Sequence, residues 1–475
     1  SKIFDDRLQQ IFEPPLEEVS QMGYPGNADP KPIIRTNLTL TDGLERESVL
    51  RYSVAAVEEE EDAILFELSE GMNGLGYQNL VLMIFRLMGF RDQWLRRGKL
   101  SQQAHSTGIA PIHLVFIEEP EAHLHPQVQQ VFINQAYKTL TAHMPNDSDN
   151  ILHTQLLVST HSSHIAHELD FAGVRYFRRG MAGRDTPVPT TTVKNLATVF
   201  GNDDETARFV KRYLQAHHCN LFFADAAILV EGAAERILLP KFVADQHPRI
   251  AQCYVEYLDV GGAHAHRLRN LIMELGIPTL VITDLDAQAP DGTKARPRRG
   301  AGQVTGSNAL RLWLNTERSI DKLLVLDDES KVARTGTGSA VRFAYQLAVK
   351  APIDSERSVQ IIPSTFEDAL AADNLRMIAE LSSVGLLRKF SDSIKAAIDD
   401  QDGSNLAEEL YGHIKGGDKA GFALELLLVL EDGEKIVAPK YISDGLKWLE
   451  GEVGRLPVLP SAEISSENAE DAEPA

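Results

Sequence analysis

Two aspartates with a single residue between them follow a short apolar run. The residues Thr279 to Thr283 (TLVIT) have the composition of a buried β-strand, and Asp284 and Asp286 come directly after them. On an extended chain, residues two apart project to the same side. Both carboxylates can therefore face one cation at the exposed end of the strand, and hard oxygen ligands suit Mg²⁺ or Mn²⁺.

Further acids follow two earlier strands of the same region. AAILVEGAAE places Glu231 at a strand end, and Glu235 one helical turn later can lie over it. A third strand ends in YLDVGG, with Asp259 before two glycines. Because the carboxyl ends of parallel strands meet at one sheet edge, we expect these five carboxylates to converge. A lone D-x-D more often marks a turn or a cap, but the three motifs in this order favour a metal site.

Such a cluster repels itself unless cations occupy it. Two metal ions about 4 Å apart can clamp the attacking and leaving oxygens of a phosphodiester. The sequence therefore predicts a site for two divalent cations in the region that follows residue 223.

A second group of polar residues lies earlier in the chain. Glu118 and Glu119 end the strand in LVFIEEPEAHLHP, and the next strand, QLLVST, is followed by His161. Acids at such a strand end can hold Mg²⁺ and orient a water at a γ-phosphate, which a histidine at the same edge can contact. The alternative is that the acids merely start a turn and that His161 caps a helix.

The elements that must position these residues are those of an α/β protein. Three short apolar runs with helices between them, from residue 226 onward, are typical of a doubly wound parallel sheet. Residues 36–43 and 47–57 alternate as short strands do, and residues 64–90 open Gly-rich and continue as a helix. The segment 340–455 has a mainly helical pattern.

Composition narrows the class of protein. A net charge of −21 argues against coating nucleic acid by bulk charge, although it permits a local basic groove. No run of 18 apolar residues predicts a membrane span, and no signal peptide is found. Two cysteines, Cys219 and Cys253, fit a reducing cytoplasm. The chain does not begin with Met, which is typical of a processed chain or a fragment.

The order E-G-x-x-E, D-x-G-G, D-x-D resembles the Toprim domain shared by topoisomerases, DnaG-type primases and OLD-family nucleases. Glu231 matches the Toprim glutamate, and Asp284 and Asp286 match its D-x-D. The glutamate at position 235 makes the first motif similar to the OLD version.

The earlier group resembles ABC-type ATPases of the RecF, SMC and OLD kind. Glu118 and Glu119 match the Walker B acids, and His161 in STHSS matches the switch histidine. SEGMNGLGYQNL is similar to the signature loop that meets ATP across a dimer interface, through Gly71, Gly74 and Gly76. A Walker A loop, G-x-x-x-x-G-K-[ST], is absent: the nearest match, GHIKGGDKA, has Asp418 in place of the lysine. We therefore expect the N-terminal part of the ATPase domain to be missing and ATPase activity to be doubtful for this chain.

Together the two resemblances imply an OLD-family nuclease of class 2. The implied division is a partial ABC-type ATPase domain (1–172), a connector helix (173–222), a Rossmann-like Toprim domain (223–335), a helical region completing the nuclease site (336–460) and an acidic disordered tail (461–475).

This resemblance implies a metal-dependent DNA endonuclease or nickase that hydrolyses phosphodiester bonds with two Mg or Mn ions. It also implies a third acid and a lysine after D-x-D, for which Glu367 in IPSTFEDAL and Lys419 in GGDKAGF are the candidates. A first-turn glutamate and a surface lysine are the plain alternatives. The catalytic residues would be Glu231, Glu235, Asp284, Asp286 and Lys419, and Asp259 and Glu367 would be further metal ligands.

ATP, bound by a complete ATPase domain, would regulate the enzyme or join a homodimer, as the resemblance implies. It further implies DNA as a partner, a UvrD-like helicase as a possible second one, and a role in phage defence. Basic residues near the motifs can grip DNA phosphates; they are Lys294, Arg296, Arg298 and Arg299 after D-x-D, and Arg208, Lys211 and Arg212 on the connector helix. His264 and His266 lack the cysteine partners of a zinc site.

Three rival functions share these motifs. A primase-like nucleotidyl transferase would need nucleoside triphosphates, and zinc-ribbon cysteines are lacking. A topoisomerase would need a nucleophilic tyrosine, but Tyr254 and Tyr257 lie on a predicted strand and are expected to be buried. A non-catalytic, ATP-switched DNA-binding module would use the acids only structurally, and metal-dependent cleavage separates it from an enzyme.

Overall fold

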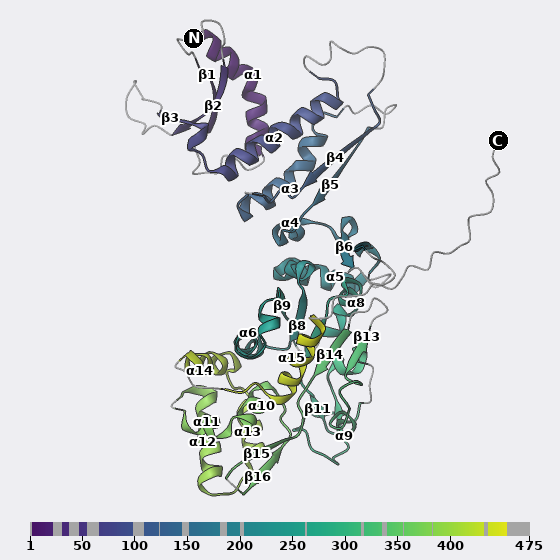
Figure 1. The fold of residues 1–475 in the computed structure, drawn as a ribbon, viewed down its shortest axis with the longest axis vertical. Coiled ribbons are helices and arrows are strands. Elements are labelled where there is room, and N and C mark those ends of the chain that lie inside the picture. Colours follow the sequence, from purple (N-terminus) through teal and green to yellow (C-terminus); the bar gives the residue numbers. More distant parts are fainter. Residues whose placement is uncertain are drawn as a thin grey trace, which may run out of the picture. The chain divides into compact units, whose positions relative to one another are not determined.

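The computed structural model divides the chain into two compact units, Ser1–Leu169 and Asp170–Ala475 (Figure 1). The structure describes residues 2–21, 31–37, 47–54, 66–97, 109–122, 124–144, 152–180, 188–199, 204–261, 264–314, 318–334, 340–354, 356–381, 383–431 and 436–453. The acidic tail 461–475 lies outside these ranges. No helix in these ranges is long and apolar enough to cross a membrane.

The first unit combines an antiparallel sheet in the order β1-β2-β3 with the parallel pair β4-β5. Its elements are α1 (Lys2–Gln21), β1 (Lys31–Asn37), β2 (Glu47–Val54), β3 (Phe66–Ser69), η1 (Glu70–Met72), α2 (Leu75–Trp94), β4 (Ile112–Glu118), α3 (Pro126–Thr141), β5 (His153–Ser159) and α4 (Ser163–Glu168). The predicted strand at 47–57 is confirmed as β2, whereas helix α1 was not predicted. The prediction at 36–43 overlaps only the end of β1, and residues 38–46 lie outside the described part.

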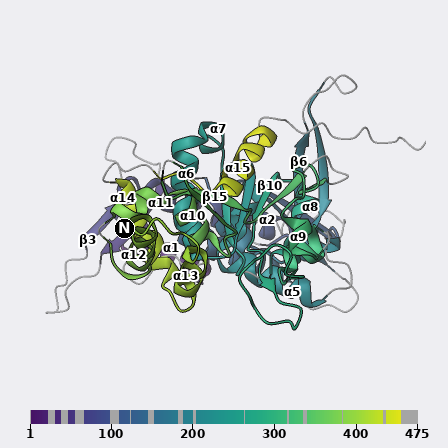
Figure 2. The same ribbon diagram turned by 90° about the horizontal axis from the view of Figure 1, so that it is seen from below.

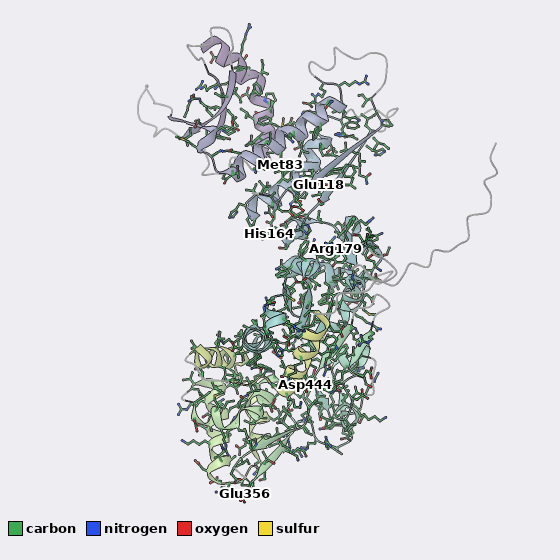
Figure 3. The ribbon with its side chains drawn as sticks, viewed as in Figure 1. Met83, Glu118, His164, Arg179, Glu356 and Asp444 are labelled. Carbon is green, nitrogen blue, oxygen red and sulfur yellow. The ribbon has the colours of Figure 1, made fainter. Side chains whose placement is uncertain are left out.

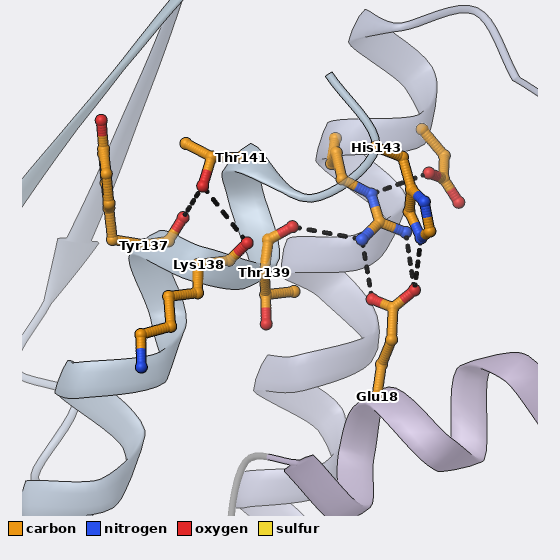
Figure 4. A network of polar contacts seen from close by, with 8 residues as sticks. Glu18, Tyr137, Lys138, Thr139, Thr141 and His143 are labelled. Atoms are coloured by element: carbon orange, nitrogen blue, oxygen red, sulfur yellow. Dashed lines mark hydrogen bonds and ion pairs between the residues drawn. The ribbon is translucent and has the colours of Figure 1, made fainter. Parts of the chain in front are cut away.

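A buried arginine joins three helices of this unit. Arg91 on α2 is only 2% exposed, and its Nη1 and Nη2 donate to Glu18 of α1 at 2.7 and 3.3 Å (Figure 4). Nη1 also donates to the carbonyl oxygen of Thr139 in α3 at 3.1 Å, and Nε to Asp92 at 2.9 Å. Burial lowers the pKa of Arg91, but the hydrogen bonds to both carboxylates outweigh it and raise that pKa. The bidentate pair therefore fixes α1 against α2.

The second unit begins with an antiparallel hairpin and continues as alternating strands and helices. Up to its third sheet strand the elements are η3 (Phe171–Gly173), β6 (Arg175–Gly180), β7 (Thr190–Asn195), η4 (Leu196–Thr198), α5 (Asp204–Tyr213), the π-helical turn η5 (Leu214–His218), η6 (Cys219–Phe223), β8 (Ala226–Val230), α6 (Ala233–Gln246), α7 (Pro248–Ala251), β9 (Val255–Asp259), η7 (Ala265–Leu268), α8 (Arg269–Leu275) and β10 (Thr279–Ile282).

The remaining elements complete the sheet and add a helical layer. They are β11 (Ala287–Gln288), β12 (Val304–Thr305), η8 (Ala309–Trp313), α9 (Ile320–Leu323), β13 (Val332–Arg334), β14 (Ala340–Ala344), β15 (Val349–Pro352), β16 (Ser358–Ile361), α10 (Phe366–Asp373), α11 (Leu375–Glu380), α12 (Gly385–Asp399), α13 (Leu406–Ile414), α14 (Lys419–Glu431) and α15 (Lys440–Val453).

The central sheet of the second unit has the strand order β13-β14-β10-β8-β9. Strands β14, β10, β8 and β9 are parallel, and only the edge strand β13 runs antiparallel. The chain passes from β8 outward to β9 and then crosses back to β10 on the other side of β8. Such a reversal opens a crevice at the carboxyl ends of β8 and β10. Glu231 and Asp284 follow these two ends.

Both faces of this sheet are covered, so its central strands are apolar throughout. Every residue of β8 and of β10 is buried. Ile228 and Leu280 belong to the core shared with the helices from α6 to α15, while Leu229 and Val281 point to the opposite face. In Figure 2, α6 and α15 lie toward one side of β10 and α8 toward the other. The predicted α/β fold with a parallel sheet and a helical C-terminal region is confirmed.

The segment 340–455 is mainly helical, as predicted, although β14 completes the sheet and β15 pairs with β16. The run AVRFA of β14 is too short for its periodicity to separate strand from helix. The connector region contains the β6-β7 hairpin ahead of its helix. Tyr254 is 46% exposed because it precedes β9 rather than lying within it, so the expectation of burial is wrong there.

The crossing of α15 over β10 yields a stability prediction. A Cβ at the buried Gly445 would lie 2.8 Å from Leu280 Cδ1 and 3.3 Å from the Ala344 Cβ, whereas one at the exposed Gly451 meets nothing within 4 Å. Gly445→Val should therefore lower the free energy of unfolding by about 1–3 kcal/mol through overpacking. Gly451→Val, on the same helix, should leave it within about 0.5 kcal/mol. Urea unfolding of both variants measures this, and equal midpoints would contradict the packing.

Candidate functional site

The turn after β8 brings two glutamates to the crevice. Glu231 follows the last residue of β8, and Gly232 is the N-cap of α6. A Cβ on Gly232 would lie 3.2 Å from Glu235 Oε2, so the glycine leaves room for Glu235 to fold back over the turn. Glu235 is 5% exposed although it is an acid in the first turn of a helix. Its burial distinguishes it from an ordinary first-turn glutamate, which faces solvent.

The end of β10 is tied to this turn by hydrogen bonds. The Thr283 hydroxyl donates to Glu231 Oε1 and lies 2.8 Å from the Ser307 hydroxyl. The fully buried Gln346 uses both ends of its amide. Its Nε2 donates to Asp284 Oδ1 at 2.6 Å, and its Oε1 accepts from the Leu285 N–H at 2.9 Å. Asp284 is thus held in one orientation by a side chain beyond β14.

The second aspartate of D-x-D has an unusual backbone. Asp286 has φ +45°, the left-handed region that non-glycine residues seldom adopt, and its carbonyl oxygen accepts from the Gly306 N–H at 2.8 Å. Lys294 Nζ lies 3.3 Å from Asp286 Oδ1. The backbone turn redirects the chain away from the sheet directly after the acids.

Asp259 reaches the same edge from β9. It is paired in register with Val230, the residue before Glu231. Its carbonyl oxygen accepts from the Tyr213 hydroxyl at 2.8 Å, and its Oδ1 accepts from the Gly261 N–H at 3.2 Å. The strand order places Asp259 on the far side of β8 from Asp284.

The helical layer supplies one more acid and a lysine. Thr365 and Asp368 form a capping box at the start of α10, which fixes Glu367 in the first turn. Glu367 is 1% exposed, and its Oε2 accepts from the Thr365 hydroxyl at 2.6 Å. Lys419, the first residue of α14, places its Nζ 3.0 Å from the same Oε2. The buried Glu367 is therefore in contact with Lys419, whose side chain is 42% exposed.

Burial and mutual repulsion dominate the electrostatics of the site. Burial raises the pKa of Glu231 to about 7, with Asp286 and Glu235 adding to the effect against the Thr283 hydrogen bond. Burial and the Glu367 carboxylate likewise raise the pKa of Glu235 to about 7. Burial, Glu231 and Glu235 hold the pKa of Asp284 well above its usual range. The carboxylates of the crevice therefore interact electrostatically with one another.

Lys419 is the positive charge within this group. Burial lowers its pKa, but Glu367 and Asp284 outweigh burial and raise that pKa. Tyr441 of α15 completes the wall: its hydroxyl lies 3.4 Å from Gln346 Nε2, and burial together with Asp284 raises the pKa of Tyr441 well above its ordinary value.

The donors at this edge fit hard divalent cations by chemical type. All six acids named above offer carboxylate oxygens, which are the ligands that Mg²⁺ and Mn²⁺ prefer. Burial and neighbouring carboxylates raise the pKa values of Glu231, Glu235 and Asp284, so a cation bound beside these three acids would favour their ionised forms. Within the described ranges, however, no three His, Cys, Asp or Glu side chains are arranged closely enough to hold one ion. One carboxylate oxygen each of Glu231 and Asp284 accepts a hydrogen bond instead, from Thr283 and Gln346 respectively.

The predicted DNA-gripping residues have different surroundings. Arg296 and Arg298 both pair with Glu408 of α13, at 3.1 and 2.7 Å, and Arg299 is exposed. Arg208 and Arg212 line a groove on α5. The histidine at position 264 packs its ring 5.1 Å from that of Phe209.

Several residues of the site were not predicted from the sequence. Thr283 is an ordinary strand residue by pattern. Gln346 could have been noticed as a polar residue two positions after the strand β14. Its partner, Asp284, could not have been predicted, because it lies 62 positions away in the chain. Tyr441 sits in an amphipathic helix with nothing to mark it.

The first unit places its predicted nucleotide residues at one edge. Glu118 ends β4 (Figure 3) and is in register with Ser159 of β5. Glu119 has φ +43°, and its Oε1 lies 3.4 Å from His161 Nε2. Glu121, which was not predicted, accepts from the His161 N–H at 2.6 Å and from the Thr160 hydroxyl at 2.9 Å. That carboxylate holds the turn that carries His161.

The glycine-rich loop precedes α2. Gly71 lies in η1, Gly74 is the N-cap of α2, and Gly76 lies in its first turn. Gln78 Nε2 closes the loop by donating to the carbonyl oxygens of Asn73 and Glu70, at 2.8 and 3.1 Å. A Cβ on Gly71 or Gly74 would meet nothing within 4 Å, so the loop surface is open.

Comparison with known families agrees with this arrangement. Residues 222–286 match the model of the TOPRIM domain of overcoming lysogenization defect protein-like proteins. The chain carries an OLD-like Toprim domain. Residues 1–166 match the model of an AAA ATPase domain. The predicted combination of the two domains is thereby confirmed.

The relatives bear related names. The chain is 28% identical over 407 residues to the endonuclease GajA of Bacillus cereus (strain HuB5-5), covering 80% of this chain and 54% of that protein. It is 30% identical over 178 residues to the OLD nuclease of Thermus scotoductus, covering 37% of this chain and 31% of that one. The chain thus spans about half the length of the first relative and about a third of the second. Among solved structures, the C-terminal region of the Burkholderia pseudomallei OLD protein matches with 23% identity and a TM-score of 0.29, over 49% of this chain and 99% of that one.

The support of Asp284 by Gln346 can be tested through stability. Gln346→Met keeps the volume but leaves the buried Leu285 N–H and the Asp284 carboxylate without their partner. We expect the free energy of unfolding to fall by about 1–3 kcal/mol. The matched control is Gln360→Met on the exposed side of β16, which should change it by less than about 0.5 kcal/mol. Denaturant unfolding in EDTA gives both values, and a neutral Gln346→Met would show that the amide bridge contributes nothing.

Proposed function

We propose that this chain is the nuclease part of a metal-dependent DNA endonuclease or nickase. The observation that carries the proposal is that acids from three elements, Glu235, Asp284 and Glu367, act together on Lys419 beside the switch point of the parallel sheet. The names of the relatives, an endonuclease and an OLD nuclease, support the same reaction class.

The proposed ligands are the six acids that follow the strand ends or come from the helical layer: Glu231, Glu235, Asp259, Asp284, Asp286 and Glu367. Two divalent cations, Mg or Mn, would supply there the positive charge that a scissile phosphodiester and its carboxylate neighbours both require.

The chain's own residues divide the remaining tasks. A crevice carboxylate, Glu231 or Glu235, would accept a proton from the attacking water. Lys419 offers its ammonium to the phosphate as negative charge develops on the phosphoryl oxygens. Gln346 would hold Asp284 in one orientation by a hydrogen bond, as residues next to metal ligands commonly do.

The first unit is proposed to serve a complete ATPase domain. Glu118, Glu119 and His161 would face the γ-phosphate, and the loop with Gly71, Gly74 and Gly76 would meet nucleotide held by a second copy. That arrangement supports a homodimer in which ATP regulates the nuclease or the pairing. A UvrD-like helicase partner, a role in phage defence and a cytoplasmic location are proposed on the resemblance alone.

Cleavage of supercoiled plasmid tests the proposal. The chain should convert plasmid to nicked or linear product with Mg²⁺ or Mn²⁺ and not with EDTA. Asp284→Asn should lose this activity, and Lys419→Met should lower it about 100-fold or more. The control is Asp245→Asn, an exposed acid of α6 that pairs with Lys241 at 3.0 Å and should cleave as the parent does. Product that persists in Asp284→Asn, or that forms equally in EDTA, would refute a metal-dependent Toprim reaction.

A further inference from the structure

A basic, aromatic groove lies beside the acid crevice. It has a volume of about 480 Å³ and is formed by one face of α5 and by η7. Its lining residues are Glu205, Arg208, Phe209, Arg212, Tyr213 and Arg267. Clefts of this size hold a small organic ligand or one unit of a polymer, since such sites usually measure about 300–1,000 Å³.

The wall of the groove is built from flat groups. The rings of Phe209 and Tyr213 are nearly parallel, 5.9 Å apart at 11°, and Tyr213 in turn stacks on His218 at 4.6 Å. The guanidinium of Arg267 lies over Phe209, 5.1 Å from the ring centre. Phe209 and Tyr213 are only half-buried, so each leaves part of its surface to the groove. The His264 ring also lies 5.1 Å from Phe209, so a flat ligand would meet the part of Phe209 that these neighbours leave exposed.

The charge of the groove is opposite to that of the chain. Three arginines line it against one acid, Glu205, which pairs with Arg267 at 3.2 Å. The whole chain has a net charge of −21, so this local excess of positive charge favours an anionic ligand. Arginines beside exposed aromatic rings are the combination that binds single-stranded nucleic acid: phosphates meet the cations and bases stack on the rings.

One hydrogen bond connects the groove to the acids. The Tyr213 hydroxyl donates to the carbonyl oxygen of Asp259 at 2.8 Å. Asp259 is in register with Val230, which precedes Glu231. The chain leaves α5 through the π-helical turn η5, which begins directly after Tyr213. A strand held in the groove therefore lies one side chain, that of Tyr213, away from the backbone of Asp259 at the end of β9.

We propose that this groove binds an unpaired nucleotide of a DNA strand, with its base on Phe209 and its phosphates near Arg208 and Arg212. The inference rests on the proposed nuclease function and adds a substrate class: DNA that is single-stranded, or locally opened, beside the scissile bond. A duplex could use the arginines but not the ring, because its bases are stacked on one another and present no free face.

Fluorescence of a base analogue tests this without cleavage. A single-stranded oligonucleotide containing 2-aminopurine, and the same strand annealed to its complement, are titrated with the full chain in EDTA. The single strand should bind with quenching of 2-aminopurine. Phe209→Leu, which keeps an apolar side chain but removes the ring, should weaken single-strand binding about 5- to 150-fold, and leave duplex binding unchanged. Tyr254→Leu, an exposed ring outside the groove, is the control and should shift it less than about 2-fold.

Each other outcome overturns the proposal. These are an unquenched analogue in the parent chain, a Phe209→Leu variant that binds single strands as well as the parent, or an equal loss for single strand and duplex. Displacement of the oligonucleotide by an oligoglutamate of equal charge, equally well in parent and variant, would assign the groove to acidic peptides. Plasmid cleavage is measured separately. If the chain nicks plasmid with metal but Phe209 plays no part in binding, the nuclease proposal stands and the groove proposal fails. If binding depends on Phe209 but no cleavage occurs, only the nuclease proposal is refuted.

Discussion

Burial of several carboxylates near one another is the constraint on which the site of the second unit depends. Glu231, Glu235 and Asp284 all have raised pKa values, which means that ionising them in the folded chain costs free energy relative to the unfolded chain. Hydrogen bonds from Thr283 and Gln346 and the ammonium of Lys419 offset part of this cost. A divalent cation bound beside these acids would offset more of this cost, because it favours their ionised forms.

The fold holds these neighbouring acids in place by attaching each of them to a rigid strand or helix. β8 and β10 are buried along their whole lengths, so their ends cannot drift apart. Glu367 and Lys419 come from helices far along the chain, and the shared core of α6, α10 and α14 brings them back to the sheet. The helical layer is thus part of the site: it supplies an acid and the cation, and α15 adds the wall that holds Gln346.

The sequence was most informative about the acidic residues that follow successive strands. The D-x-D pair, E-G-x-x-E and D-x-G-G follow neighbouring parallel strands, as expected, so their acids come to the same edge of the sheet. Glu367 and Lys419 were reached only through family resemblance, since a first-turn glutamate and a lysine have no distinctive spacing. Gln346 and the Tyr213–Asp259 bond could not be predicted, because both join positions that only the sheet order brings together. Strand β14 was missed since its five residues, AVRFA, are too few to show a period.

The most direct test of the charge balance is the stability of the chain as a function of metal ion. Unfolding is followed with increasing Mn²⁺ or Mg²⁺ in the parent and in Asp284→Asn. The account predicts that metal stabilises the parent, by about 2.7 kcal/mol at a hundred times the dissociation constant, and stabilises the variant far less. It also predicts that in EDTA the variant is at least as stable as the parent, because a repelling charge is gone. Metal that stabilises neither protein, or both equally, would contradict the account.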